Sequence, residues 1–187
     1  MEKHFILTEE FKINSDGVKL FRIQCTRKIP TVNIGDLGGF IEKEKNLSGN
    51  AWVEQDAEVY GNAWVSGNAW VYGNARIYDN AEVFGNTEIT GNAEVSGSAH
   101  INGNLEINGE AEILHNRDFC CFQSFGSRGK TTSVFKEKGN KIKIIAGCFK
   151  GNIKEFEEAV EKTHGNNQFG KEYKAIINVI KIRFNLN

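Results

Sequence analysis

The sequence predicts a mainly β protein whose centre is a solenoid, and three observations lead to this prediction. Residues 41–114 repeat with a period of six. Residues 1–40 hold two strand-like apolar runs, and residues 115–187 mix strand and helix patterns. A single six-residue unit buries too little surface to be stable, whereas stacked units share one core. We therefore expect an N-terminal β cap (1–40), a solenoid (41–114) and a small α+β module (115–187).

The first segment fits the role of a cap. HFILTEEFKI (residues 4–13) and GVKLFRIQC (residues 17–25) read as strands, and GDLGGF follows them. The end of a solenoid exposes unpaired backbone and part of the core. We expect this segment to cover that end.

Each repeat unit reads small-x-aliphatic-x-Gly-Asn. The alternation of small and aliphatic residues marks a short strand with one buried face. Gly and Asn both tolerate the left-handed backbone region, so this pair marks a tight corner. The aliphatic residue recurs every six positions without a slip, at Ile41, Leu47, Val53, Val59, Val65, Val71, Ile77, Val83, Ile89, Val95, Ile101, Ile107 and Ile113.

This pattern resembles the hexapeptide-repeat, left-handed parallel β-helix superfamily. The resemblance implies that three hexads form one triangular coil, so that residues 41–114 form about four coils with the aliphatic residues inside. Members of the superfamily are typically homotrimers that pack through their flat faces. A homotrimer is therefore the expected assembly.

Aromatic residues occupy several outward positions of the predicted coils. Large apolar side chains on a solvated surface usually mark contacts, which predicts a subunit interface. A ring-stacking surface for a ligand and decoration without function are the alternatives. The predicted interface residues are Trp52, Trp64, Trp70, Tyr60, Tyr72, Tyr78 and Phe84.

The C-terminal segment differs in kind from the repeat. Residues 118–127, 131–139 and 141–149 read as strands. Residues 152–165 read as a helix that Asn152 caps, with Glu155 completing a capping box. A second helix is predicted from Lys171 to about Phe184.

Charge is distributed unevenly along the chain. Residues 46–115 hold one basic and ten acidic residues, a net charge of −9, whereas residues 116–187 hold fourteen basic and seven acidic residues, +7. The asymmetry predicts either different partners for the two parts or an electrostatic contact between them.

A narrower resemblance covers most of the chain. Short proteins of phages and prophages combine a hexapeptide solenoid with a similar tail. The shared motifs here are GDLGGFIEKEKNLS (35–48), GSRGKTT (126–132), GCFKGNIKEF (147–156) and THGNN (163–167). The resemblance implies a phage or prophage origin, with the host cytoplasm as the location. It names no reaction.

The GSRGKTT stretch is the candidate ligand site. Two glycines free the backbone, while a planar guanidinium, an amine and hydroxyl groups suit a phosphate or carboxylate. The spacing is not that of a Walker A loop, and a β-turn with basic decoration is the alternative. His164 is added at the end of the first helix, although it can equally be a helix cap. The predicted ligand-binding residues are Ser127, Arg128, Lys130, Thr131, Thr132 and His164.

Catalysis is the main alternative to binding. Many hexapeptide proteins resemble acyl-CoA-dependent transferases that use a catalytic histidine, and the candidates here are His100 and His115. No protruding loop interrupts the hexads from 47 to 113, so the usual wall of an acceptor pocket is missing. We therefore predict a non-catalytic binding protein without a cofactor. An acyl-CoA-dependent hexapeptide acyltransferase and a structural phage assembly component are the alternatives.

The cysteines and the hydropathy of the chain bear on disulfides, metal sites and membrane segments. Cys25, Cys120, Cys121 and Cys148 show no metal-ligand spacing, and adjacent strand residues point to opposite faces, so we expect reduced thiols and no metal. No apolar run approaches the ~18 residues of a membrane span, and no signal peptide is evident at the N-terminus. We expect a cytoplasmic protein without a membrane partner.

The expected partners are other copies of the chain and one further molecule. That molecule is a small anionic or nucleotide ligand, or else a host protein. Nucleic acid is not an expected partner, because the acidic solenoid would repel a duplex. One hypothesis is that the chain blunts a host defence system by sequestering a nucleotide signal.

Overall fold

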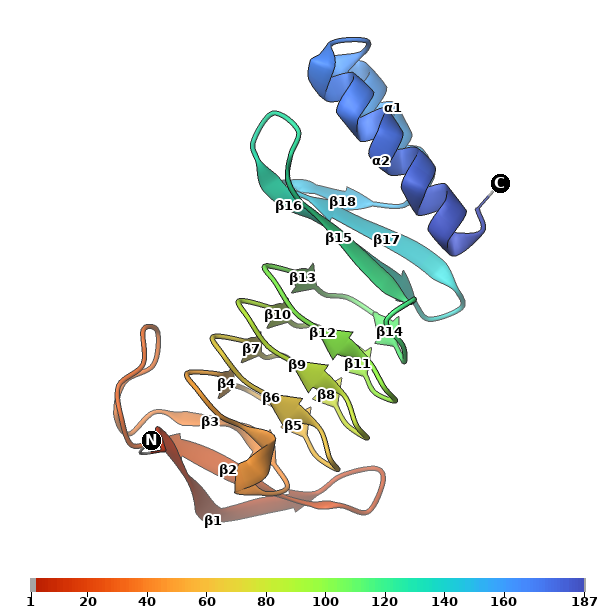
Figure 1. Cartoon of the computed structure of the whole chain (residues 1–187). Helices are drawn as coiled ribbons and strands as arrows, with labels where there is room; N and C mark the ends of the chain where they lie inside the picture. Colours follow the sequence, from red (N-terminus) through yellow and green to blue (C-terminus); the bar gives the residue numbers. More distant parts are fainter. Residues whose placement is uncertain (1–2, 187) are drawn as a thin grey trace.

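The computed structural model describes residues 3–186 and shows an elongated molecule with the cap at one end and the C-terminal module at the other (Figure 1). The cap contains β1 (Phe5–Ile13), β2 (Lys19–Cys25) and β3 (Leu37–Ile41), followed by a short 3-10 turn at Glu44–Asn46. The solenoid strands are β4 (Trp52–Val53), β5 (Glu58–Val59), β6 (Trp64–Val65), β7 (Trp70–Val71), β8 (Arg76–Ile77), β9 (Glu82–Val83), β10 (Glu88–Ile89), β11 (Glu94–Val95), β12 (His100–Ile101), β13 (Glu106–Ile107) and β14 (Glu112–Ile113).

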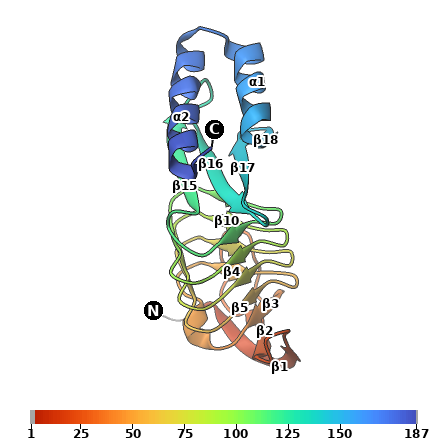
Figure 2. The same ribbon diagram turned by 90° about the vertical axis from the view of Figure 1, so that its right-hand side faces the viewer.

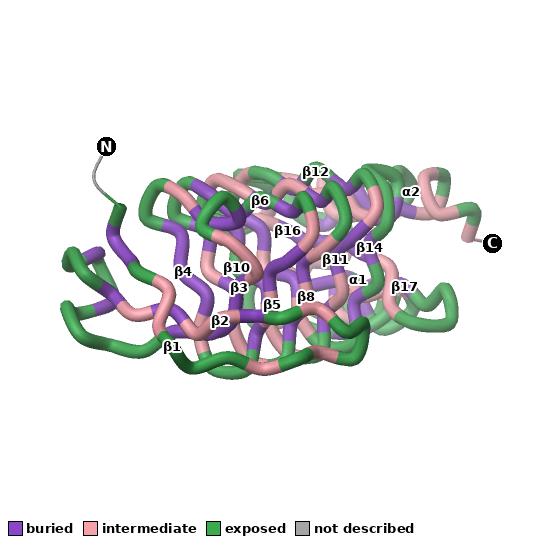
Figure 3. Tube along the Cα trace, turned by 90° about the horizontal axis from the view of Figure 1, so that it is seen from below, coloured by how far each residue is buried: buried purple, intermediate pink, exposed green. Residues whose placement is uncertain are grey.

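The solenoid strands stack in three parallel sheets, each strand pairing with the strand one coil later. Trp52 pairs with Trp70 and Trp70 with Glu88, so one coil contains three hexads as predicted. The repeat aliphatic residues lie inside the column, almost all of them completely buried. Figure 3 shows buried positions along the inside of the coils and exposed positions at the corners. The predicted fold class, with about four coils of parallel β-solenoid, is confirmed.

The glycine found in most hexads suits the close approach of successive coils and the positive φ of the corner. Gly67 has φ +71°, and a Cβ there would lie 2.9 Å from the backbone nitrogen of Gly85 in the next coil. Gln55 and Asp79 take the place of this glycine in two hexads and keep φ at +59° and +58°. At Asp79 a local hydrogen bond supports this conformation. Its carboxylate accepts the N–H of Gly97, 3.3 Å away, which compensates for the less favourable backbone.

The cap is continuous with one sheet of the solenoid. Its three strands are antiparallel, and β3 pairs in parallel with β5, so that a single seven-stranded sheet runs from β1 to β14. Gly38 makes this junction possible, because a Cβ there would lie 2.6 Å from the carbonyl oxygen of Val53. The GDLGGF motif is therefore the seam between cap and solenoid.

The expectation that all seven aromatic residues are exposed is wrong for Trp52 and Tyr60. Trp52 is 2% exposed and lies beside the ring of His4. Tyr60 is 4% exposed and packs with Leu20 and Phe40. The cap folds over the first coil and covers both side chains, a contact that the repeat itself does not encode.

The other five residues remain at the surface of the chain. Trp64 is 42% exposed, and the rest are half-buried: Trp70, Tyr72, Tyr78 and Phe84. That they form a subunit interface stays a prediction.

The C-terminal module is an antiparallel sheet covered on one face by two helices (Figure 2). Asn152 caps α1 and forms the predicted capping box with Glu155. The second helix begins three residues earlier than predicted, because the side chain of Asn167 accepts the N–H of Gly170 and caps it there. The elements are β15 (Phe119–Phe125), β16 (Lys130–Glu137), β17 (Lys141–Ala146), β18 (Phe149–Gly151), α1 (Ile153–His164) and α2 (Gln168–Phe184).

The module closes the second end of the solenoid. Phe135 and Ile145 are buried in the core that runs through the coils. Around them the basic module meets the acidic solenoid: Lys150 pairs with Glu106 at 2.6 Å, and Lys138 pairs with Glu94 at 3.0 Å. An electrostatic contact between the two parts is thus present. Because these pairs are partly exposed they add at most about 1 kcal/mol each, so the apolar contact dominates.

No helix within residues 3–186 is both long enough and apolar enough to cross a membrane. The described cysteines are all free thiols. The adjacent pair behaves as predicted: Cys120 packs against the core beneath the helices, and Cys121 packs against the solenoid core.

Candidate ligand-binding site

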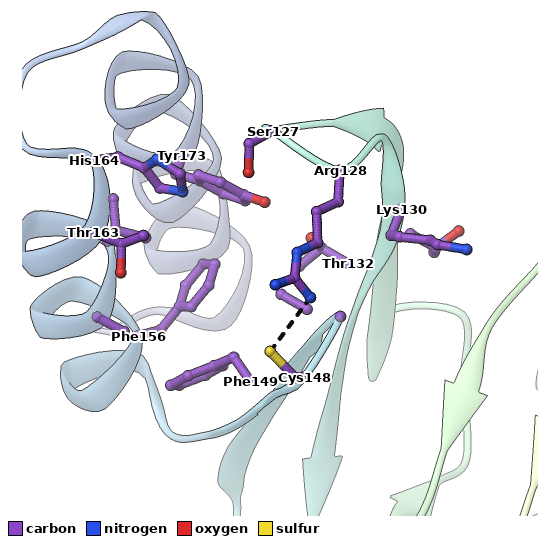
Figure 4. Close-up of a pocket in the computed structure, with 15 residues that line it drawn as sticks. Ser127, Arg128, Lys130, Thr132, Cys148, Phe149, Phe156, Thr163, His164 and Tyr173 are labelled. Atoms are coloured by element: carbon purple, nitrogen blue, oxygen red, sulfur yellow. Dashed lines mark hydrogen bonds between the residues drawn. The ribbon is translucent and has the colours of Figure 1, made fainter.

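A cavity of about 190 Å³, here called the inner cavity, lies between the turns of the module sheet and the two helices (Figure 4). All six residues predicted to bind a ligand line it, although they come from a turn, a strand and a helix. That they bind a ligand stays a prediction. The lining is Ser127, Arg128, Lys130, Thr131, Thr132, Ala146, Gly147, Cys148, Phe149, Phe156, Ala159, Val160, Thr163, His164 and Tyr173.

One wall of the inner cavity is the turn between β15 and β16. The N–H of Gly126 donates to the carboxylate of Glu172 on α2, 3.1 Å away. Gly126 has φ +70°, and a Cβ there would overlap the hydroxyl of Tyr173, so no other residue allows the turn to lie this close to α2. The turn is thereby fixed to the helix.

The turn directs Arg128 across the mouth of the inner cavity. The Arg128 Nη1 lies 3.6 Å from Cys148 Sγ, and its side chain passes 4.0 Å from the position that a Cβ of Gly147 would take. Among the described residues no carboxylate forms an ion pair with Arg128. Its guanidinium donors therefore remain available to an anion.

The opposite wall is aromatic. The rings of His164 and Tyr173 stack with their centroids 5.6 Å apart and their planes 25° apart. Phe156 meets Tyr173 edge-on at 5.7 Å, and Phe149 lies 5.0 Å from Phe156. Burial raises the pKa of the Tyr173 phenol, and the charge of Glu172 acts in the same direction. The phenol is consequently neutral at pH 7 and can donate a hydrogen bond.

Of this aromatic wall, sequence reasoning found His164 but missed Phe149, Phe156 and Tyr173. In the sequence, Tyr173 and Phe156 can be explained as parts of the apolar faces of their helices. Both do pack in the core beneath the helices, but they also border the cavity. Phe149 and Cys148 follow a glycine with φ +61°, which exposes Cys148 at the rim. The signal available in the sequence was Gly147, a glycine at the end of the apolar run KIKIIA.

A second cavity of about 560 Å³, here called the outer cavity, adjoins the first on the side of the solenoid. Arg128 and Lys130 line both cavities, so the turn separates them. The carboxylate of Glu106 also faces the outer cavity, but Lys150 neutralises it at 2.6 Å. The remaining lining is polar in part, with Asn104, Thr131, Ser133, Ile145, Gly147 and Cys148.

The two candidate catalytic histidines lie elsewhere, on the surface of the solenoid. His100 Nδ1 is 2.8 Å from Glu82 Oε2, and its ring meets Phe84 edge-on at 4.8 Å. His115 Nδ1 lies 3.3 Å from Ser98 Oγ. Both histidines are exposed, and neither lines the inner or the outer cavity.

No group of three or more metal-ligating side chains within residues 3–186 is placed to hold an ion. The pair of cavities around Arg128 brings together chemically distinct groups from several elements, and it includes every residue predicted to bind a ligand.

Comparison with known proteins supports the solenoid. A family model described as the YdcK beta solenoid repeat matches residues 57–73, about one coil. No match was found among curated proteins, and none among solved structures. Together with the stacked coils, the match shows a β-solenoid repeat protein. It does not reach the C-terminal module.

Proposed function

We propose that this chain is a non-catalytic binding protein in which the β-solenoid is a scaffold and the C-terminal module binds a small anionic, nucleotide-like ligand. The observation that carries the proposal is the inner cavity, which places a guanidinium on one side and aromatic rings on the other. Guanidinium groups bind phosphate through several donors at once. Aromatic rings add stacking energy with a planar base.

Binding without reaction fits the contacts of the cavity. A nucleophile used in catalysis lies within hydrogen-bond reach of its base. In the described part of the chain, however, Cys148 lies next to Arg128, and His164 stacks on Tyr173. These contacts support binding rather than proton transfer.

The test is calorimetry of the wild-type protein and of Arg128→Ala against a panel of nucleotides. Wild type should bind at least one nucleotide, and Arg128→Ala should weaken that binding tenfold or more. Arg117→Ala is the matched control, because Arg117 is an exposed arginine of the same module that does not line either cavity. Absence of binding by the wild-type protein to every nucleotide would overturn the proposal.

The biological setting rests on the phage-type motifs of the sequence. A phage or prophage protein in the host cytoplasm can oppose a host defence system by sequestering a nucleotide signal, and a homotrimer would present three such sites. Mass spectrometry of small molecules bound to protein from infected cells, together with a pull-down of host proteins, tests this role. Recovery of neither a nucleotide nor a host protein would count against it.

One observation favours a second function. The Glu82 carboxylate orients the His100 ring at 2.8 Å, as an acidic residue orients a catalytic base. An acyl-CoA-dependent transferase should therefore turn over acetyl-CoA and lose this activity in His100→Ala or His115→Ala. If neither binding nor turnover is found but a phage protein copurifies, the chain would instead be a structural assembly component.

A further inference from the structure

The two cavities suggest how a ligand would be divided between them. Resting on the proposed function, we propose that the ligand is a nucleoside phosphate whose base enters the inner cavity while its sugar and phosphate lie across the Arg128–Lys130 turn in the outer cavity.

The size of the inner cavity favours a ring rather than a whole nucleotide. Its volume is about 190 Å³, below the roughly 300 Å³ at which pockets begin to hold complete small ligands. Its lining includes Ala146, Ala159 and Val160 as well as the aromatic wall. Burying a phosphate against these apolar groups would be costly, so the uncharged end of the ligand belongs here.

The walls of the inner cavity suit a planar ring. Arg128 lies on one side, while Phe149, Phe156 and Tyr173 lie on the other, with the space between them open (Figure 4). A guanidinium plane and an aromatic ring both stack on the faces of a heteroaromatic ring. Ser127 and Thr163 also line the cavity, and a hydroxyl can bond to the polar edge of a base.

The outer cavity suits the charged end of the ligand. Arg128 and Lys130 supply positive charge to it, and the Glu106 carboxylate is already paired with Lys150.

This arrangement predicts an order of affinities. A nucleoside 5′-phosphate uses both cavities, whereas a nucleoside fills only the inner one, and ribose 5-phosphate or pyrophosphate fills only the outer one. The nucleoside phosphate should therefore bind at least tenfold more tightly than any of its parts.

Calorimetry with AMP, GMP, CMP and UMP, the matching nucleosides, ribose 5-phosphate and pyrophosphate tests the proposal. Ala159→Leu fills the inner cavity with a side chain that a helix accepts readily. It should weaken nucleotide binding at least tenfold and reduce it to the level of ribose 5-phosphate. Ala175→Leu, on an exposed position of the other helix, is the matched control and should change nothing. Lys130→Ala should weaken binding of the nucleotides more than binding of the nucleosides, because only the nucleotides carry a phosphate.

The outcomes separate this inference from the proposed function. If ribose 5-phosphate or pyrophosphate binds as tightly as the nucleotides, and Ala159→Leu has no effect, the base does not enter the inner cavity, yet the module still binds an anion. If none of the probes binds the wild-type protein, both the inference and the proposed function fail.

Discussion

Arg76 on the side of the solenoid donates to Asp16 at the tip of the β1–β2 hairpin, with 2.6 Å between Nη2 and Oδ2. The same carboxylate accepts the hydroxyl of Tyr60, also at 2.6 Å. The Arg76 guanidinium lies over the stacked rings of Tyr60 and Tyr78, whose centroids are 5.2 Å apart. The contact ties the far end of the cap to the second coil.

Replacing Arg76 should weaken this contact between the cap and the solenoid. Arg76→Leu removes the ion pairs with Asp16 and Glu58 and the contact with the two rings, and it should lower the free energy of unfolding by about 1 kcal/mol. Urea denaturation measures the change. Arg117→Leu serves as control, since Arg117 makes no ion pair within residues 3–186. Equal effects of the two substitutions would show that the Arg76 contact contributes nothing to the free energy of unfolding.

His4 should make the free energy of unfolding depend on pH below about 6.5. Burial lowers the pKa of His4 below its usual 6.5, which outweighs the opposing hydrogen bond to the Ala51 carbonyl. That carbonyl can only accept, so the His4 Nε2 carries the proton. The unfolded chain therefore binds more protons than the fold between pH 6.5 and the pKa of the folded state, and stability falls as the pH drops through this window.

Denaturation at pH 7, 6 and 5 tests the assignment. The loss of stability on going from pH 7 to 5 should be smaller in His4→Gln, which can still donate to Ala51 but does not titrate. His100→Gln, at an exposed site, should behave like wild type. Identical pH profiles for wild type and His4→Gln would rule out this role for His4.

Cys148 should be the thiol that reacts first. It is exposed at the rim of both cavities. Burial raises the pKa of the Cys25 thiol and raises that of Cys120 to about 11, so both remain unreactive thiols at pH 8. Labelling with a chromogenic disulfide should show one fast phase, absent in Cys148→Ser and present in Cys25→Ser. A fast phase that survives in Cys148→Ser would contradict the exposure seen here. A bulky adduct on Cys148 should also block the cavities.

The predicted trimer is tested at Trp64, the most exposed of the aromatic residues on the coils. Trp64 donates from Nε1 to Ser48 Oγ and is 42% exposed. Trp64→Arg should convert a trimer to monomers in sedimentation experiments, because an unpaired charge in an interface is costly. The matched control, Ile6→Arg, changes an exposed residue of the cap and should leave the assembly unchanged. If the wild-type protein sediments as a monomer, the predicted trimer is wrong.

The sequence predicted those parts of the fold that depend on local pattern. The alternation of Ala and Val, interrupted by Gly-Asn, defines a coil without reference to anything distant. Asn152 and Glu155 are three residues apart, so the helix cap could be read directly. The burial of Trp52 could not be read in this way, because it results from residues of the cap, such as His4, that lie outside the repeat.

The candidate site was predicted only in part, for a similar reason. The suitability of Arg128 and Lys130 for binding an anion can be recognised from the sequence of one loop. The aromatic rings of Phe149, Phe156 and Tyr173 come from three elements, and each of them can be explained locally as core. Their convergence on Arg128 depends on how α1 and α2 pack on the sheet, which no repeat or motif encodes.

The coils join to one another through bonds that recur every 18 residues, such as the amide chain from Asn50 to Asn68 and from Asn68 to Asn86. A duplicated coil entering at a Gly-Asn corner would meet the same partners above and below it. The column would grow by about 4.8 Å, while both ends kept their own geometry. Gene duplication can thus set the distance between cap and cavities without any redesign of either.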